Sequence, residues 1–119
     1  MAGLYIHVPF CVRKCGYCDF YSIPAAEDSP AITAYLDALE QELKRLPADF
    51  SPQTVFIGGG TPTAMSATKL KSFLALLAKA LAGCKVSEWT CEVNPGTLTP
   101  EKVDLLLEAG VNRVSIGMQ

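Results

Sequence analysis

The 119-residue sequence has no long apolar run, no concentration of basic charge and no positively charged leader. No stretch approaches the roughly 20 consecutive apolar residues of a membrane-spanning helix, and the N-terminus lacks the basic start and apolar run of a signal peptide. Its 10 Lys and Arg residues are dispersed among 12 Asp and Glu residues, which excludes the charge footprint of a nucleic-acid-binding protein. We therefore expect a cytoplasmic protein with no nucleic-acid partner, and with membrane contact only through other proteins.

Histidine is also scarce, whereas cysteine is not. The single histidine, His7, has the setting of a hydrogen-bonded structural residue on a strand rather than of a metal ligand. Five cysteines, an odd number in a reducing compartment, indicate metal ligands and buried thiols rather than a disulfide framework. Half of the residues are apolar, and there is no repeat, low-complexity segment or composition shift. Residues 1–119 are therefore expected to form one globular unit without an internal boundary.

Strand-like and helix-like segments alternate along the chain. Ser29 followed by Pro30, and then Ser66, are predicted to start two helices, and Thr99 starts a third helix that Gly110 ends. Strands are predicted at residues 4–8, 54–57, 87–93 and 111–118. This order implies right-handed βαβ units and a parallel sheet, so the predicted class is α/β.

The predicted sheet has one polar face. Tyr5 and His7 share a face of the first strand, and Glu92 and Gln119 lie on the polar faces of the third and fourth. A complete (β/α) barrel usually fills its interior with apolar layers, so a polar face predicts an open, partial barrel lined for a ligand. The alternative is a solvated sheet face. Because the sequence stops directly after the fourth strand, we expect a barrel truncated at that point.

Three cysteines lie within eight residues, in the loop after the first strand. Cys11, Cys15 and Cys18 are too few for a closed zinc site, which would need Cys84, Cys91 or His7 as well. Three thiolates on a [4Fe-4S] cluster instead leave one iron with an open position. Arg13 and Lys14 either favour the thiolate form of these cysteines or are ordinary surface bases.

The cysteine spacing resembles the signature of the radical S-adenosylmethionine (SAM) superfamily. The flanking sequence resembles the branch that contains oxygen-independent coproporphyrinogen III oxidases and HemW-type heme chaperones, over residues 5–11 (YIHVPFC), 17–21 (YCDFY), 58–63 (GGGTPT), 92–97 (EVNPGT) and 113–119 (RVSIGMQ). The resemblance implies the N-terminal part of a radical SAM core domain, truncated after its fourth strand. It also implies that a reduced [4Fe-4S] cluster on Cys11, Cys15 and Cys18 cleaves SAM to methionine and a 5'-deoxyadenosyl radical.

The same resemblance implies the SAM contacts. Gly59, Gly60 and Thr61 would contact the methionine end of SAM, Tyr5 and Tyr17 would line the cluster and cofactor, and Glu92 and Gln119 would reach SAM from their strand ends. Strand parity independently places Glu92 and Gln119 on one face. Two structural alternatives remain open: the glycines form a tight turn, and Glu92 pairs with Arg113. Trp89, Cys84 and Cys91 are expected in the core, and the helix charges on solvated faces.

One position separates the two branches. The oxidases carry a fourth cysteine one residue after the third, where this sequence has Phe20. This difference favours a HemW-type heme chaperone, for which the resemblance implies heme or porphyrin binding, an electron donor and heme-receiving respiratory proteins. The alternatives are the oxidase itself and a non-catalytic heme carrier with a structural cluster.

Overall fold

The computed structural model of the chain describes residues 3–11, 23–24 and 29–116. Four strands form one sheet in the order β1-β4-β5-β6, and each neighbouring pair is parallel. Their bounds are Gly3–Val8, Thr54–Gly59, Glu88–Val93 and Arg113–Ile116. The prediction of a four-stranded parallel sheet is therefore confirmed. The sequence analysis missed a second, two-stranded parallel sheet of β2 (Phe10–Cys11) and β3 (Ile23–Pro24).

The helices begin where their capping residues predict, and the third ends where its glycine predicts. They are α1 (Pro30–Lys44), α2 (Ala67–Ala80) and α3 (Pro100–Ala109), with a short 3₁₀ turn, η1 (Pro62–Ala64), before α2. The hydroxyl groups of Ser29, Ser66 and Thr99 each accept a backbone N–H of the first helical turn. Gly110 ends α3 in the left-handed region, at φ 117°. No helix in the described part of the chain has the length and apolar character to cross a membrane.

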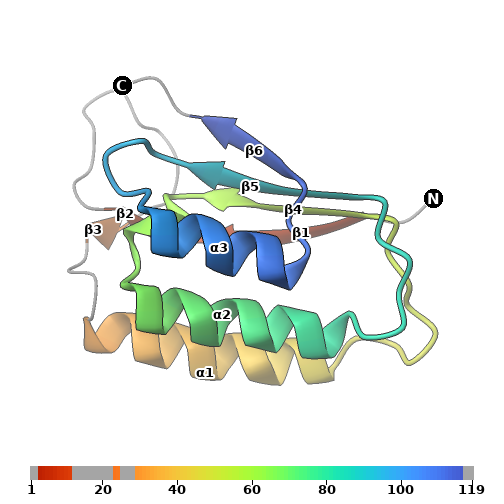
Figure 1. Ribbon diagram of the computed structural model, residues 1–119. Helices are drawn as coiled ribbons and strands as arrows, with labels where there is room; N and C mark the ends of the chain where they lie inside the picture. The colour runs from red at the N-terminus through yellow and green to blue at the C-terminus, as the bar shows by residue number, and fades with distance from the viewer. Residues whose placement is uncertain (1–2, 12–22, 25–28, 117–119) are drawn as a thin grey trace.

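All three helices lie on one side of the four-stranded sheet, as Figure 1 shows. The core fills the space between these two layers. Its members are buried apolar residues from the strands (Ile6, Val8, Val55, Ile57, Trp89, Cys91 and Val93) and from the helices (Ile32, Leu36, Leu70, Phe73, Leu74, Leu77 and Leu106). The core positions predicted for Trp89 and Cys91 are confirmed, whereas Cys84 is only half-buried.

The strand order and the one-sided helices identify the architecture. Strands that are neighbours in the sheet follow one another along the chain, and each connecting helix crosses on the same side. A doubly wound sheet would instead have helices on both faces and a reversal of strand order. The arrangement is that of a partial (β/α) barrel, as predicted, with the helix-free sheet face in the position of the barrel interior.

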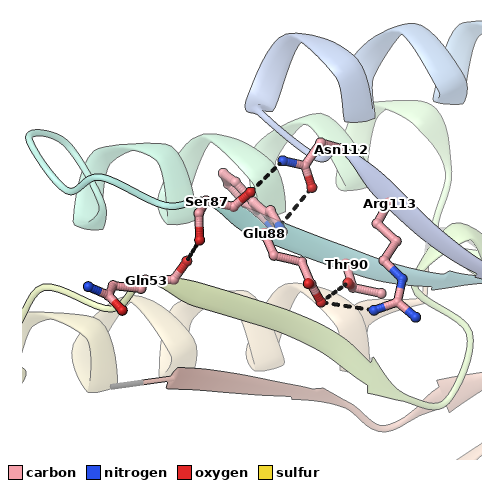
Figure 2. A network of polar contacts seen from close by, with 7 residues as sticks. Gln53, Ser87, Glu88, Thr90, Asn112 and Arg113 are labelled. Carbon is pink, nitrogen blue, oxygen red and sulfur yellow. Dashed lines mark hydrogen bonds and ion pairs between the residues drawn. The ribbon is translucent and has the colours of Figure 1, made fainter. Parts of the chain in front are cut away.

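A network of polar contacts ties together the amino ends of β4, β5 and β6 (Figure 2). Ser87 donates its N–H and hydroxyl to the carbonyl oxygen of Gln53, at 2.8 and 3.0 Å. The side chain of Asn112 donates to Ser87 O (3.1 Å) and accepts from the N–H of Trp89 (2.9 Å). These bonds hold the starts of three strands in register. The loops at the opposite, carboxyl ends take no part in this network and are available for a functional site.

Candidate functional site

Three predicted site segments meet at the carboxyl ends of the parallel strands. The β2 segment, with Cys11, follows β1; Gly58 and Gly59 end β4 and lead into Gly60 and Thr61; and residues 94–99 follow β5. Parallel α/β sheets bind ligands at this edge. Cys11 pairs with Pro24 between β2 and β3 through its backbone. Cys15, Tyr17, Cys18 and Gln119 lie outside the described residues.

The glycine loop is packed against atoms of the protein itself. A Cβ on Gly58 would collide with the Glu92 carboxylate, and a Cβ on Gly60 would collide with the carbonyl oxygen of Phe10. Gly59 has a positive φ of 101°, and a Cβ there would collide with the His7 ring. These glycines therefore let the backbone lie close against β1, β2 and β5, where any side chain would collide.

The amides of this loop already have acceptors. The Gly60 N–H donates to Val8 O at 2.6 Å and the Thr61 N–H to Phe10 O at 2.7 Å, while the Gly59 N–H donates to Glu92 Oε1 at 3.0 Å. What the loop offers a ligand is therefore its carbonyl oxygens, which have spare lone pairs. Carbonyl oxygens suit the ammonium group of an amino acid rather than its carboxylate.

Glu92 lies on the helix-free face of β5 and is half-buried. Its contact with Gly59 joins β4 to β5 directly at the carboxyl edge. The Arg113 guanidinium instead pairs with Glu88, with Nη1 and Oε1 2.9 Å apart, in the network of Figure 2. Arg113, the alternative partner considered for Glu92, thus pairs with a carboxylate four residues earlier on β5, and the Glu92 carboxylate faces the site.

Aromatic side chains cover the same face beside the glycine loop. The rings of Tyr5 and Phe56 stack with centroids 6.0 Å apart, and the Tyr5 hydroxyl lies 3.1 Å from Nδ1 of His7. Burial, followed by the Glu92 charge, raises the pKa of Tyr5, so this hydroxyl stays protonated at neutral pH. His7 is hydrogen-bonded, as expected. The sequence analysis did not select Phe56, although its parity between Val55 and Ile57 on β4 placed it on this face.

The zinc alternative receives no support from the described residues, which contain no group of three or more His, Cys, Asp or Glu side chains able to hold a metal ion. Cys91 lies in the core between sheet and helices, whereas His7 lies on the opposite, helix-free face. Burial, and then the Glu92 charge, raises the pKa of the Cys91 thiol to about 12. Cys91 is therefore a neutral thiol, and metal binding requires the thiolate.

The prediction that charged helix residues lie on solvent-exposed faces is wrong for one lysine. Lys102 on α3 is buried, and its Nζ donates to Thr63 O at 2.7 Å and Thr97 O at 3.1 Å. The sequence signal was weak: Lys102 stands at the first turn of α3, four residues before the core residue Leu106, and so on its inward face. The lysine links the segment after the glycine loop to the segment after β5.

Comparison with known proteins decides the family. The family model described as "Radical SAM superfamily" matches residues 5–119. The chain belongs to the radical SAM superfamily. Membership implies a [4Fe-4S] cluster and SAM as cofactors. The chemistry of the described site fits SAM, because a half-buried carboxylate and a row of backbone carbonyl oxygens suit an ammonium group, and the three closely spaced cysteines of the sequence supply the thiolates that a cluster needs.

The radical SAM chain is similar to heme chaperones along its whole length. It is 43% identical to "Heme chaperone HemW" of Bacillus subtilis, over 100% of this chain and 32% of that protein. It is 38% identical to "Heme chaperone HemW" of Escherichia coli, over 98% of this chain and 32% of that one. The solved structure of coproporphyrinogen III oxidase (HemN) from Escherichia coli superimposes with a TM-score of 0.82 and 31% identity, over 99% of this chain and 28% of that structure. The chain thus spans about a third of the length of the curated relatives it matches.

Proposed function

We propose that residues 1–119 are the N-terminal part of the core domain of a HemW-type heme chaperone. The similarity to two HemW proteins along nearly the whole chain supports this branch. The sequence points the same way, because Phe20 stands where the oxidases have their extra cysteine. The protein would bind heme or a porphyrin in the cytoplasm, accept electrons from a donor and pass heme to respiratory proteins.

In this proposal the cluster and SAM occupy the carboxyl edge of the sheet. Cys11, Cys15 and Cys18 would hold a [4Fe-4S] cluster and leave one position open for SAM. When bound and reduced, this pair supplies radical chemistry. The chain's own residues position it: the carbonyl oxygens of Gly59 and Gly60 and the side chains of Thr61, Glu92 and Gln119 contact SAM, and Tyr5 and Tyr17 line the site.

The observation that carries the proposal is the contact between Glu92 and Gly59. The 3.0 Å bond from the Gly59 N–H to Glu92 Oε1 brings a carboxylate and a carbonyl-rich loop to one point on the helix-free face. Two distant sequence motifs therefore form a single site, as a zwitterionic ligand requires. A solvated sheet face would not need a half-buried carboxylate fixed against a glycine loop.

Iron loading and SAM binding test the proposal in the protein as its gene encodes it. Anaerobic reconstitution should yield about four irons per chain, and replacing Cys11, Cys15 and Cys18 together by Ala should abolish loading. SAM should bind the reconstituted protein in calorimetry and not the triple variant. Equal iron content in the two proteins, or binding of zinc in place of iron, would contradict the assignment.

A second candidate is the oxidase, favoured by the match to the HemN structure. Turnover separates the two functions. An oxidase should decarboxylate coproporphyrinogen III and release 5'-deoxyadenosine in proportion to product. A chaperone should bind heme and transfer it to an acceptor protein without decarboxylation. Heme binding without SAM cleavage, even under strong reductant, would instead favour the non-catalytic carrier.

A further inference from the structure

Lys102 carries a buried positive charge that no carboxylate neutralises within the described residues. The residue is 7% exposed, and the one ion pair within the described residues joins Arg113 to Glu88 on the sheet. The ammonium group instead faces two carbonyl oxygens, of Thr63 and Thr97. Burying an ammonium group costs free energy that an apolar side chain of equal length would not. An apolar side chain would fill this position at lower cost, so the lysine is explained by the two hydrogen bonds that its ammonium group donates.

The first of its partners is rigidly connected to the glycine loop. Thr63 is fully buried in the turn η1. This turn closes when the Ala64 N–H donates to Thr61 O at 2.9 Å, and Thr61 in turn donates its N–H to β2 at Phe10 O. A hydrogen bond that fixes Thr63 O thus fixes the position of Thr61, two residues away.

The second partner belongs to the turn that follows Glu92. The N–H and hydroxyl of Thr97 both donate to Asn94 O, at 2.9 and 3.1 Å, and Asn94 Oδ1 accepts the Gly96 N–H at 2.8 Å. Thr97 also meets Thr63 directly, with the two hydroxyl oxygens 2.7 Å apart. Lys102 therefore closes a three-residue clip, formed by Lys102, Thr63 and Thr97, behind the contact of Gly59 with Glu92.

We propose that Lys102 is a positioning residue of the SAM site: through Thr63 and Thr97 it holds the glycine loop and the Glu92 strand at a single spacing. The Gly59–Glu92 bond joins the two strands at the front of the site, and the clip joins their following loops behind it. Without the clip, Gly59 and Glu92 remain present but are held less rigidly. This inference rests on the proposed function, because it takes SAM as the ligand.

Lys102→Met, which keeps the length and removes the charge, is the test, made in the gene-encoded protein with its cluster reconstituted. SAM affinity, measured by calorimetry, should fall about tenfold, the effect of roughly one lost positioning hydrogen bond, while iron content stays unchanged. Amide hydrogen exchange of residues 59–61 should become faster. Lys102→Arg, which keeps the charge and two or more donors, should recover part of the affinity.

Two matched variants separate positioning from general destabilisation. Lys69→Met removes a lysine that donates to Thr33 Oγ1 at 2.7 Å between the first turns of α1 and α2, outside the clip. Leu36→Ala lowers thermal stability by opening a cavity at a buried core position. Both should leave SAM affinity and the exchange of residues 59–61 as in the wild type, when all variants are compared well below their melting temperatures.

The outcomes distinguish this inference from the proposed function. If the wild type binds SAM and Lys102→Met binds it equally well, the positioning role is wrong and the proposed function stands. If the wild type itself binds no SAM, the proposed function fails first. If Lys102→Met does not fold, Lys102→Gln decides: its shorter, uncharged side chain cannot reach both carbonyl oxygens, and SAM affinity unchanged from the wild type would overturn the proposal.

Discussion

Glu92 shows how much of the candidate site depends on single side chains. Its carboxylate accepts the Gly59 N–H, occupies the space that a side chain on Gly58 would need, and contributes to the raised pKa of Tyr5. Arg113 does not neutralise it, because that guanidinium pairs with Glu88. Glu92 therefore presents negative charge to the open face of the sheet, where an ammonium group would approach.

We predict that Glu92→Gln weakens SAM binding without loss of iron. The amide oxygen still accepts from Gly59, but the charge facing the ligand is lost, and a hydrogen bond to a charged partner contributes about 1.5–3 kcal/mol. Calorimetry of the reconstituted protein measures the change. Glu88→Gln is the control, since it removes a carboxylate from the same face of β5 at the end far from the site. Equal effects of the two substitutions would contradict the assignment.

The buried thiol of Cys91 is expected to make the free energy of unfolding fall at alkaline pH. Burial raises its pKa from 9.0 to about 12, so the unfolded chain loses this proton first as pH rises. The thiol therefore contributes stability that is fully present below pH 9 and is lost between pH 9 and 12, at up to about 1.4 kcal/mol per pH unit.

The measurement is urea unfolding from pH 8 to 11. The wild type should be more stable than Cys91→Ala at pH 8, because the alanine leaves a cavity, and this advantage should shrink as pH rises. Val93→Ala truncates a core residue on the same face of β5 without removing an ionisable group. The loss of unfolding free energy caused by Val93→Ala should not change with pH. If the loss caused by Cys91→Ala is constant as well, Cys91 ionises alike in the folded and unfolded states.

At the scale of elements, the end of α3 is set by a glycine with two separate constraints. Gly110 has a φ of 117°, a region that L side chains rarely adopt. A Cβ there would also lie 3.1 Å from ring carbons of Trp89, which is buried beneath it. The helix end and the indole ring thus fit against each other, and this contact fixes where the chain turns into β6.

Gly110→Ala should destabilise the fold more than Gly83→Ala does. Gly83, after α2, also has a positive φ, of 86°, but a Cβ there would meet nothing within 4 Å. Both variants carry the left-handed backbone penalty, of about 1 kcal/mol, and only Gly110→Ala adds crowding against Trp89. Denaturant unfolding measures both free energies. If Gly83→Ala loses as much unfolding free energy as Gly110→Ala, or more, the Trp89 ring moves aside without a measurable loss of stability.

At the scale of the whole molecule, the helix layer leaves one part of the sheet uncovered. Val114 and Ile116 on β6 share the helix side of the sheet with Cys91 and Val93, their register partners, yet they are 47% and 56% exposed. Leu107 on α3 is exposed as well. The described sheet also has two outer strands, β1 and β6, each with one unpaired side. Apolar surface beside an open strand edge favours association with another chain.

We therefore predict that residues 1–119, prepared as an isolated polypeptide, self-associate. Light scattering should show oligomers at micromolar concentration, and thermal unfolding should be broad. Replacing Val114 and Ile116 together by Thr, which keeps strand propensity and removes apolar surface, should reduce the association. A monomeric wild-type fragment with one sharp transition would show that the four-stranded unit is self-sufficient.

The sequence by itself determined the elements and their order, because those depend on local chemistry. Ser29, Ser66, Thr99 and Gly110 mark the helix ends through caps that form within a few residues, and strand parity placed Glu92 opposite the core. It also indicated the family, since motifs are read along the chain. The short β2–β3 pair was missed, because two-residue strands carry no periodic signal.

Only the tertiary structure decided which partners these residues take. Glu92 contacts Gly59, Arg113 contacts Glu88, and Lys102 turns inward to Thr63 and Thr97. These pairs are 25 to 39 residues apart, except for Lys102 with Thr97. Such contacts depend on sheet register and on how each helix packs, so no local pattern specifies them. A buried lysine and a solvated one look the same in a sequence until the fold brings two carbonyl oxygens to its ammonium group.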